Sequence, residues 1–282
     1  FLSDNISGLS RSTIKKMITE GMVFVNGELS KPSFKLEGKE KISYDIFEKK
    51  ENFDHLIPQK IDLNILYEDK DIIAIDKPAG LTVHPGAGQK NNTLANALVF
   101  HFRELSDING PIRPGIVHRL DKNTSGVMLI AKNNEAHASL SRQFENREID
   151  KEYNAITWGK FESLNGEISL FIARSKKDPT SYIASENGKK ALTFYSSKPL
   201  GGYVSEVVFK PKTGRTHQIR VHSSTIGNPI FGDTKYGGGI NRSRGYLPEV
   251  SKILNNLLKN INRHALHASS ITFSHPVSKK IK

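Results

Sequence analysis

The sequence predicts an α+β fold with a mainly antiparallel sheet, preceded by a smaller N-terminal domain. The chain has 282 residues, of which 37% are hydrophobic and 25% charged, a balance that suits one large domain or a large and a small one. Strand-like and helix-like segments do not alternate strictly along the chain, as they would in a doubly wound fold. Residues 49–60 are charged, have no hydrophobic period and are predicted to be a linker.

The small domain is predicted over residues 1–48. The segment from Arg11 to about Glu20 has apolar residues at helical spacing. After it, the apolar run Val23–Val25 leads into Asn26-Gly27, the strongest short signal for a β-hairpin. A helix followed by a hairpin is therefore expected.

One side of this helix is predicted to be basic. Arg11 and Lys15 are four residues apart, and Lys16 adjoins them. Runs of charge are usually solvated surface, so an ordinary helix and hairpin with no ligand is the alternative interpretation.

The large domain is predicted over residues 61–282, and it begins with the strands Leu63–Tyr67 and Ile72–Ile75. Thr93 is suited to cap a helix that runs to His101. The remaining predicted strands are Val127–Ala131, Tyr153–Trp158, Leu192–Tyr195, Val204–Phe209 and Ser270–Phe273. The remaining predicted helices are Glu135–Asn146, His217–Thr225 and Pro248–Ile261, the last with Leu254, Leu257, Leu258 and Ile261 toward the core.

The charge of the chain points to a polyanionic partner. Its formal net charge is +12 and its sequence pI is about 9.6, which favours nucleic acid or an anionic membrane. Membrane is the weaker interpretation, because no apolar run approaches the roughly 20 residues that span a bilayer and no signal peptide opens the chain. The absence of cysteine excludes disulfides and thiolate metal sites and is compatible with a cytoplasmic protein.

The stretch His118–Gly126 is the best candidate for catalysis. It places Asp121 two residues from Arg119 and next to Lys122, just before an apolar strand. Nearby cations favour the ionised form of a carboxylate, which is then ready to act as a nucleophile or a base. A solvated surface ion pair is the alternative for such a triplet taken alone.

Three other stretches carry residues suited to a nucleic-acid site. They are Asp76–Gly80 with Lys77, Lys151–Ala155 with Tyr153, and Gly214–His222 with Arg215 and Arg220. Together with His118–Gly126 they closely resemble the motifs of the RluA/RluD-type RNA pseudouridine synthases. The segments Asn228–Gly237 and His264–Ala268 match that family as well.

The resemblance implies a catalytic domain with a mostly antiparallel, bisected sheet and an RNA cleft across its middle. It implies that Asp121 is the essential catalytic residue, that Arg220 pairs with it, and that Tyr153 stacks on the flipped uracil. Arg119 would enter the RNA stack in place of the flipped base, a step that offsets part of the cost of unstacking. The further expected RNA contacts are Lys77, His118 and Arg215.

The stretch Leu9–Lys31 resembles the S-four type RNA-binding domain. By that resemblance, Arg11, Lys15 and Lys16 are expected to contact RNA. Family members usually continue past the stretch equivalent to His275-Pro276 with a final apolar strand. The chain is therefore expected to be truncated at its C-terminus, and its start at Phe1 without Met suggests missing N-terminal residues as well.

The implied reaction isomerises uridine to pseudouridine within RNA, and large-subunit ribosomal RNA or its precursor is the expected partner, with transfer RNA as an alternative. Substrate and product have the same composition, so no cofactor is expected. No metal is expected either, although His264 and His267 leave a metal site as an alternative. A monomer without membrane contact is expected. The alternative functions are a non-catalytic RNA-binding or ribosome-assembly factor and a hydrolase of free nucleosides. Whether Asp121 attacks the sugar, attacks the base or takes a proton stays open.

Overall fold

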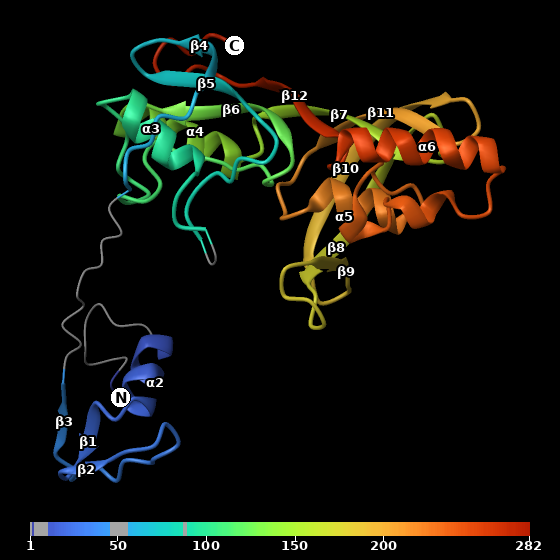
Figure 1. Ribbon diagram of the computed structural model, residues 1–282. Helices are drawn as coiled ribbons and strands as arrows, with labels where there is room; N and C mark the ends of the chain where they lie inside the picture. The colour runs from blue at the N-terminus through green and yellow to red at the C-terminus, as the bar shows by residue number, and fades with distance from the viewer. Residues whose placement is uncertain (1, 3–10, 46–55, 87–88) are drawn as a thin grey trace. The chain divides into compact units, whose positions relative to one another are not determined.

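The computed structural model describes residue 2 and residues 11–45, 56–86 and 89–282 (Figure 1). The chain divides into two compact units, Phe1–His55 and Leu56–Lys282. Residues 56–60 belong to the larger unit, where Leu56 packs on a hydrophobic core and the Gln59 amide donates to the Asn96 carbonyl at 3.1 Å. The predicted linker is therefore too long at its C-terminal end.

The smaller unit consists of a helix and a three-stranded antiparallel sheet of order β2-β1-β3. Asn26 and Gly27 join β1 to β2 with φ angles of 53° and 86°, as a type I′ hairpin turn requires. Ile14, Met17 and Val23 form its buried core, so the predicted helix and hairpin are confirmed. The elements are α2 (Arg11–Thr19), β1 (Val23–Val25), β2 (Glu28–Leu29) and β3 (Ile42–Tyr44).

The larger unit is built on a nine-stranded sheet of order β4-β5-β6-β12-β7-β11-β10-β8-β9. Every neighbouring pair is antiparallel except β6 and β12, so the predicted mainly antiparallel α+β fold is confirmed. The strands are β4 (Asn64–Glu68), β5 (Ile72–Lys77), β6 (Ser125–Ala131), β7 (Asp150–Trp158), β8 (Asn165–Arg174), β9 (Tyr182–Ala184), β10 (Lys189–Leu200), β11 (Val204–Pro211) and β12 (Leu266–Thr272).

The helices cover the two halves of this sheet separately. Figure 1 shows α3 (Leu94–His101) and α4 (Asn134–Glu145) beside the half that holds β4 to β6, and α5 (Gln218–Thr225) and α6 (Pro248–Ile261) beside the other half. Each predicted helix is present within two residues of its expected bounds. None of the helices in the described residues has the length and apolar character needed to cross a membrane.

Helix α6 differs from expectation in one residue of its apolar face. Leu254 is buried, and Leu258 and Ile261 pack against the same core. Leu257 was predicted to face that core, but it is 50% exposed and lines an open apolar groove. It lies three residues from Leu254, at the edge of the apolar stripe, where helical periodicity alone does not fix burial.

The two halves of the sheet meet at a short parallel contact between β6 and β12. Only two residue pairs are in register there, Ser125 with His267 and Gly126 with Ala268. Gly126 has φ +122°, and a Cβ atom at this position would lie 2.2 Å from the Ala268 carbonyl oxygen. Tyr153 on β7 packs against the hydrophobic cores of both halves. The two halves of the sheet are therefore joined at the middle by one short, close backbone contact between β6 and β12.

Candidate active site

Asp121 lies in the loop that leads into β6, and backbone contacts hold this loop in place. The Asp121 carbonyl accepts a hydrogen bond from the Thr124 amide at 3.1 Å, which closes a tight turn. The ammonium group of Lys77 donates to the Lys122 carbonyl at 3.2 Å, and the Gly80 amide donates to the same oxygen at 2.8 Å. The Asp121 side chain is 19% exposed, so its carboxylate is fixed but accessible from outside.

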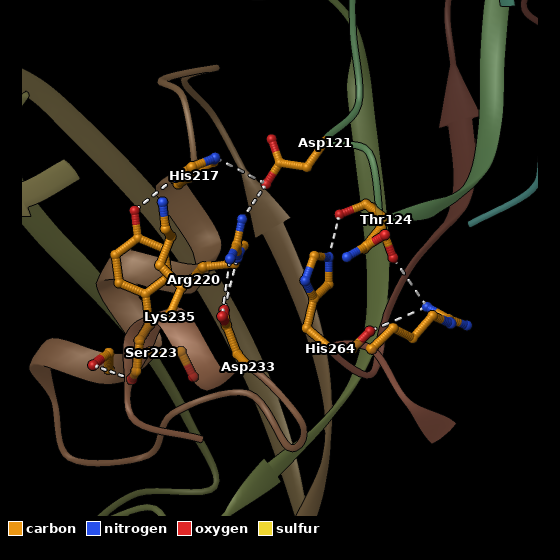
Figure 2. A network of polar contacts seen from close by, with 12 residues as sticks. Asp121, Thr124, His217, Arg220, Ser223, Asp233, Lys235 and His264 are labelled. Atoms are coloured by element: carbon orange, nitrogen blue, oxygen red, sulfur yellow. Dashed lines mark hydrogen bonds and ion pairs between the residues drawn. The ribbon is translucent and has the colours of Figure 1, made fainter. Parts of the chain in front are cut away.

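Helix α5 supplies the cation that faces this carboxylate (Figure 2). Arg220 Nη1 donates to Asp121 Oδ2 at 2.9 Å. Arg220 Nε and Nη2 donate to Oδ2 and Oδ1 of Asp233 at 2.7 and 2.9 Å. One guanidinium group therefore bridges two acids, with a two-bond contact to Asp233 and a single bond to Asp121.

The environment of Arg220 keeps it charged. Burial opposes the charge, but the hydrogen bonds and negative charge of Asp233, followed by those of Asp121, outweigh this effect and raise the pKa of Arg220 above its ordinary value. The ring of Tyr236 adds a cation–π contact, with its centroid 4.8 Å from the guanidinium carbon. Arg220 is thus a permanent cation beside Asp121.

His217 also faces Asp121, from a strained backbone position. It begins α5 with φ 56° and ψ 20°, a left-handed conformation that costs energy for a residue other than glycine. Its Nδ1 shares a hydrogen bond of 2.6 Å with the Tyr236 hydroxyl, and its Nε2 lies 3.8 Å from Asp121 Oδ2. Burial lowers the pKa of His217, although the charge of Asp121 opposes this shift. The imidazole is therefore neutral at pH 7, with one nitrogen directed at the acid.

These groups surround a small pocket that opens into a larger basic groove. The pocket has a volume of about 100 Å³, and Asp121, Tyr153 and Arg220 are among its lining residues. Burial, and then the charge of Asp121, raises the pKa of Tyr153, so its phenol is protonated at neutral pH. The adjoining groove has a volume of about 470 Å³. Its ionised lining residues are one acid, Glu145, and the cations Arg119, Arg147, Lys151, Lys212 and Arg215.

The comparisons with known proteins agree with this geometry. Residues 71–225 match the protein family described as RNA pseudouridylate synthase. A protein of Aquifex aeolicus that is named as an uncharacterized RNA pseudouridine synthase is 46% identical over 240 residues, which cover 84% of this chain and 75% of the relative. Ribosomal large subunit pseudouridine synthase D of Vibrio cholerae is 38% identical over 278 residues, which cover 98% of this chain and 83% of the relative.

This chain belongs to the RNA pseudouridine synthase family. It is therefore an isomerase that converts uridine in RNA to pseudouridine. Among solved structures, the human RNA Pseudouridylate Synthase Domain Containing 1 is 27% identical with a TM-score of 0.58, and the match covers 78% of this chain and 81% of the human one.

The pocket of this pseudouridine synthase brings together most of the residues that the sequence singles out. Asp121, Tyr153 and Arg220 line it, and Arg119 and Arg215 line both the pocket and the groove. The salt bridge between Asp121 and Arg220 joins residues that are 99 positions apart in the chain. The expected pairing is therefore present in the structure, while the roles of these residues in the reaction stay predictions.

The structure contradicts the prediction made for Lys77. It was expected to contact RNA, but its side chain is fully buried, and its ammonium donates to the carbonyl oxygens of Pro78, Leu81 and Lys122 at 2.8, 3.0 and 3.2 Å. Burial lowers its pKa to about 8. The synthase therefore uses Lys77 to hold the loop of Asp121, because three carbonyl groups take all the donors that a phosphate would need.

His118 also has a role inside the fold. Its Nε2 accepts a hydrogen bond from the Leu129 amide at 2.9 Å, and its ring packs on Phe144 with the centroids 4.6 Å apart. His118 is among the residues that line the basic groove, so contact with RNA stays a prediction for this residue. In the smaller unit Lys15 is exposed, whereas the side chains of Arg11 and Lys16 lie outside the described residues.

Sequence reasoning did not single out three residues of this site, namely His217, Asp233 and Tyr236. His217 lies inside the recognised stretch Gly214–His222, and membership of that motif is the signal that could have identified it as a residue of the site. Asp233 and Tyr236 lie in Asn228–Gly237, and the match of that segment to the family was the signal available. Their contacts with Arg220 and with each other depend on how the chain returns to α5, which residue spacing does not reveal.

The two histidines considered as metal ligands have hydrogen-bond partners in the protein. His264 Nε2 bonds to Thr124 Oγ1 at 2.8 Å, and His267 Nδ1 bonds to Ser125 Oγ at 2.9 Å. Both contacts join β12 and the segment before it to the start of β6. In the described residues the one cluster spaced for a metal ion is Asp69, Asp71 and His275. The two acids lie at the turn between β4 and β5, and His275 comes from the segment after β12.

The lowered pKa values of His264 and His118 predict how the stability of the fold depends on pH. Burial lowers the pKa of His264 to about 4 and that of His118 to about 3, whereas an unfolded histidine titrates near 6.5. The unfolded chain therefore binds more protons below pH 6.5, and stability is lost as the pH falls from 6.5 toward 4. Each such histidine is expected to cost about 2 kcal/mol of unfolding free energy at pH 5.

Urea denaturation at pH 7 and pH 5 measures this loss. His264→Gln should reduce the difference between the two pH values, while the same change at the exposed His101 should leave it intact. If the stability of wild type and of His264→Gln depended on pH in the same way, His264 would not be a source of the loss of stability at low pH.

Proposed function

We propose that Asp121 carries out the isomerisation on a uridine that has been flipped into the pocket. The observation that supports this most directly is the Asp121 carboxylate, held 2.9 Å from the buried Arg220 in a pocket that opens into a basic groove. A uridine stacked in RNA cannot present its glycosidic bond to a fixed carboxylate, so the nucleotide has to leave its stack first.

Two residues beside Asp121 are suited to this flipped state. Tyr153 offers a neutral aromatic ring, and stacking of a base on such a ring contributes about 1–3 kcal/mol. Arg119 is exposed where the pocket meets the groove, so its guanidinium can enter the gap that the uridine leaves and pair with phosphate. A factor that only bound RNA would have no need of the acid, the buried arginine and the tyrosine in one pocket.

The proposed substrate is large-subunit ribosomal RNA or its precursor. The relative from Vibrio cholerae is named for the ribosomal large subunit and aligns with 98% of this chain, including the smaller unit. Chemical mapping of pseudouridine in ribosomal and transfer RNA, from cells with and without the gene, tests this. Loss of a site in large-subunit RNA supports the proposal, and loss confined to transfer RNA contradicts it.

We also propose that the protein acts as a monomer in the cytoplasm, where ribosomes are assembled. Asp121, Arg220 and Tyr153 all come from one chain, so no second copy is needed to complete the pocket. Sedimentation with and without RNA tests the monomer, and a stable dimer that is active only as a dimer would contradict it.

We propose that the smaller unit adds RNA affinity through Arg11, Lys15 and Lys16 on α2. Replacing all three with glutamine in the full chain should weaken RNA binding and make the negative slope of log affinity against log salt shallower by about 2, because fewer phosphates are neutralised. Filter binding across a salt series measures this slope.

The matched control replaces Lys35, Lys39 and Lys41, three exposed lysines of the same unit, with glutamine. Both triple variants lose the same net charge, so a long-range effect of charge would change the two slopes equally. Equal slopes in the two variants would remove the proposed role of α2.

A further inference from the structure

The neighbours of His217 determine which of its ring nitrogens carries the proton. The Tyr236 hydroxyl accepts a hydrogen bond from the Tyr182 amide at 2.9 Å and lies 2.6 Å from His217 Nδ1. Burial raises the pKa of Tyr236, so the hydroxyl keeps its single proton. Among the described residues His217 Nδ1 is the one acceptor for that proton. Nδ1 is therefore unprotonated, and Nε2 carries the N–H group of the neutral ring.

The ring of His217 is held firmly in this orientation. It meets the rings of Tyr182 and Tyr236 edge to face, with centroid distances of 5.4 and 5.6 Å. Its backbone is left-handed, with φ 56° and ψ 20°, and strained backbone of this kind is concentrated at functional sites. Two aromatic rings and a strained turn therefore fix the direction of the Nε2–H group.

This Nε2–H group has no hydrogen-bond acceptor within the described parts of the chain. Asp121 Oδ2 lies 3.8 Å away, too far for a hydrogen bond, and already accepts one from Arg220 Nη1 at 2.9 Å. The His217 side chain is only 16% exposed and lines the pocket, and Figure 2 shows its ring directed at the Asp121 carboxylate. A largely buried donor without an acceptor is unfavourable, so this group is available for an oxygen atom of the substrate.

A flipped uridine offers an oxygen atom in the right place. In the proposed reaction the glycosidic bond C1′–N1 lies beside Asp121. The uracil oxygen O2 is attached to the ring carbon next to N1, whereas O4 lies across the ring from N1. A donor placed 3.8 Å from the Asp121 carboxylate therefore meets O2 rather than O4.

Negative charge develops on O2 when Asp121 acts on the sugar. The electron pair of the C1′–N1 bond stays on N1 and is shared with O2 through the adjoining carbonyl group. As a nucleophile, Asp121 forms an ester bond to C1′. As a base, it takes a proton from C2′, and the electrons of that C–H bond form a double bond to C1′. Both versions leave a uracil anion.

The anion then has to rejoin the sugar through carbon. Its C5 atom bonds to C1′, while the ester to Asp121 breaks or the proton returns from Asp121 to C2′. In the product the proton of C5 has moved to N1, so no further reactant is needed. A protonated imidazole would pass its proton to the anion and make it a poor carbon nucleophile, whereas a neutral imidazole donates a hydrogen bond and keeps its proton.

We propose that His217 binds O2 of the flipped uracil through Nε2–H and stabilises the uracil anion that forms when the glycosidic bond breaks. A fixed donor directed at developing negative charge contributes more in the transition state than in the bound substrate, which is how such donors accelerate a reaction. This inference rests on the proposed function, in the versions in which Asp121 acts on the sugar.

Two substitutions separate the roles of the two ring nitrogens. Asparagine tolerates left-handed backbone and places its amide near the position of Nδ1, without a donor at Nε2. Glutamine places its amide nitrogen near Nε2. With total RNA from cells that lack the gene as substrate, His217→Asn should lower kcat by about 100-fold, and His217→Gln should recover about tenfold of this loss. The KM for RNA should change little, because His217 does not line the groove.

The matched control is His101→Asn, the same change at an exposed histidine outside the pocket, which should keep both constants. A kcat of His217→Asn within about twofold of wild type would overturn the proposal. Equally low kcat values for His217→Asn and His217→Gln would overturn it as well, because they would assign His217 a purely structural role. Full activity of Asp121→Asn would instead contradict the proposed function, so the two failures are distinguishable.

Sulfur in place of a uracil oxygen tests the contact without a change to the protein. Synthetic RNA around the mapped uridine carries 2-thiouridine or 4-thiouridine at the target. Sulfur accepts hydrogen bonds weakly, so 2-thiouridine should lower kcat of the wild type by about tenfold, and 4-thiouridine should have a smaller effect. In His217→Asn the effect of 2-thiouridine should disappear, because the contact is already lost.

An effect of 2-thiouridine that is equal in wild type and His217→Asn would overturn the proposal. A larger effect of 4-thiouridine than of 2-thiouridine in the wild type would also overturn it, since the charge would then develop on O4. This second comparison needs no variant, so it decides the question even if His217→Asn does not fold.

Discussion

Asp121→Asn is expected to abolish isomerisation and to leave both RNA binding and the fold nearly intact. Asparagine keeps the shape of the side chain and can accept the bond from Arg220 Nη1, but it is neither a nucleophile nor a base. Loss of such a residue lowers kcat by about 10⁴-fold or more. Pseudouridine formation in a single-turnover assay, together with RNA binding and thermal melting of the same sample, measures all three properties.

The control for this variant is Asp178→Asn, which makes the same chemical change at an exposed acid outside the pocket. It should retain wild-type turnover. Normal turnover by Asp121→Asn would assign the chemistry to another group, and the neutral His217 would then be the nearest candidate, with Nε2 3.8 Å from the Asp121 carboxylate.

Arg220→Met is expected to be damaging to both stability and activity. The change leaves Asp233, with 2% exposure, as an unpaired buried charge, and it removes the cation that faces Asp121. Breaking a buried ion pair in this way costs about 3–5 kcal/mol. Chemical denaturation should show this loss, and turnover should be undetectable even at temperatures where the variant is folded.

Arg215→Met is the matched control, because it removes the same charge from the same motif. Arg215 lies at the pocket and groove, and its Nε donates to the Lys190 carbonyl at 3.2 Å in an exposed setting. This variant should stay stable and bind RNA more weakly. If the two variants lost stability equally, the buried ion pair would not have the importance assigned to it.

The elements with local signals were predicted well from the sequence. Helix α6 has the expected bounds, Pro248 and Ile261, because proline favours the first turn of a helix and the apolar period is regular. The strands β8 and β9 were missed. In β8 exposed residues alternate with buried or half-buried ones from Asn165 to Ile172, so the two-residue period was present and was overlooked. Strand β9 has only three residues, which are half or fully exposed, and it is too short to show such a period.

The sequence predicted the residues of the site that lie in recognisable motifs, but not the contacts that buried Lys77 and Asp233 make in the fold. The family resemblance indicated that Asp121 and Arg220 would meet, and they do. Lys77 was assigned to RNA because it lies in a motif that resembles the family. The three carbonyl groups that take its hydrogen bonds belong to the backbone, which no pattern of side chains reveals. The bridge from Arg220 to Asp233 was missed because a buried acid and a surface acid look the same in a sequence.

The short contact between β6 and β12 has a consequence for how activity depends on folding. Asp121 enters from the β6 half of the sheet, whereas Arg220 belongs to α5, which packs on β8, β9 and β10 in the other half. Neither half of the sheet therefore supplies both Asp121 and Arg220. If Asp121 and Arg220 act together as proposed, we expect a newly made chain with only one folded half to be inactive toward uridine, and activity to appear only after both halves have folded and packed together.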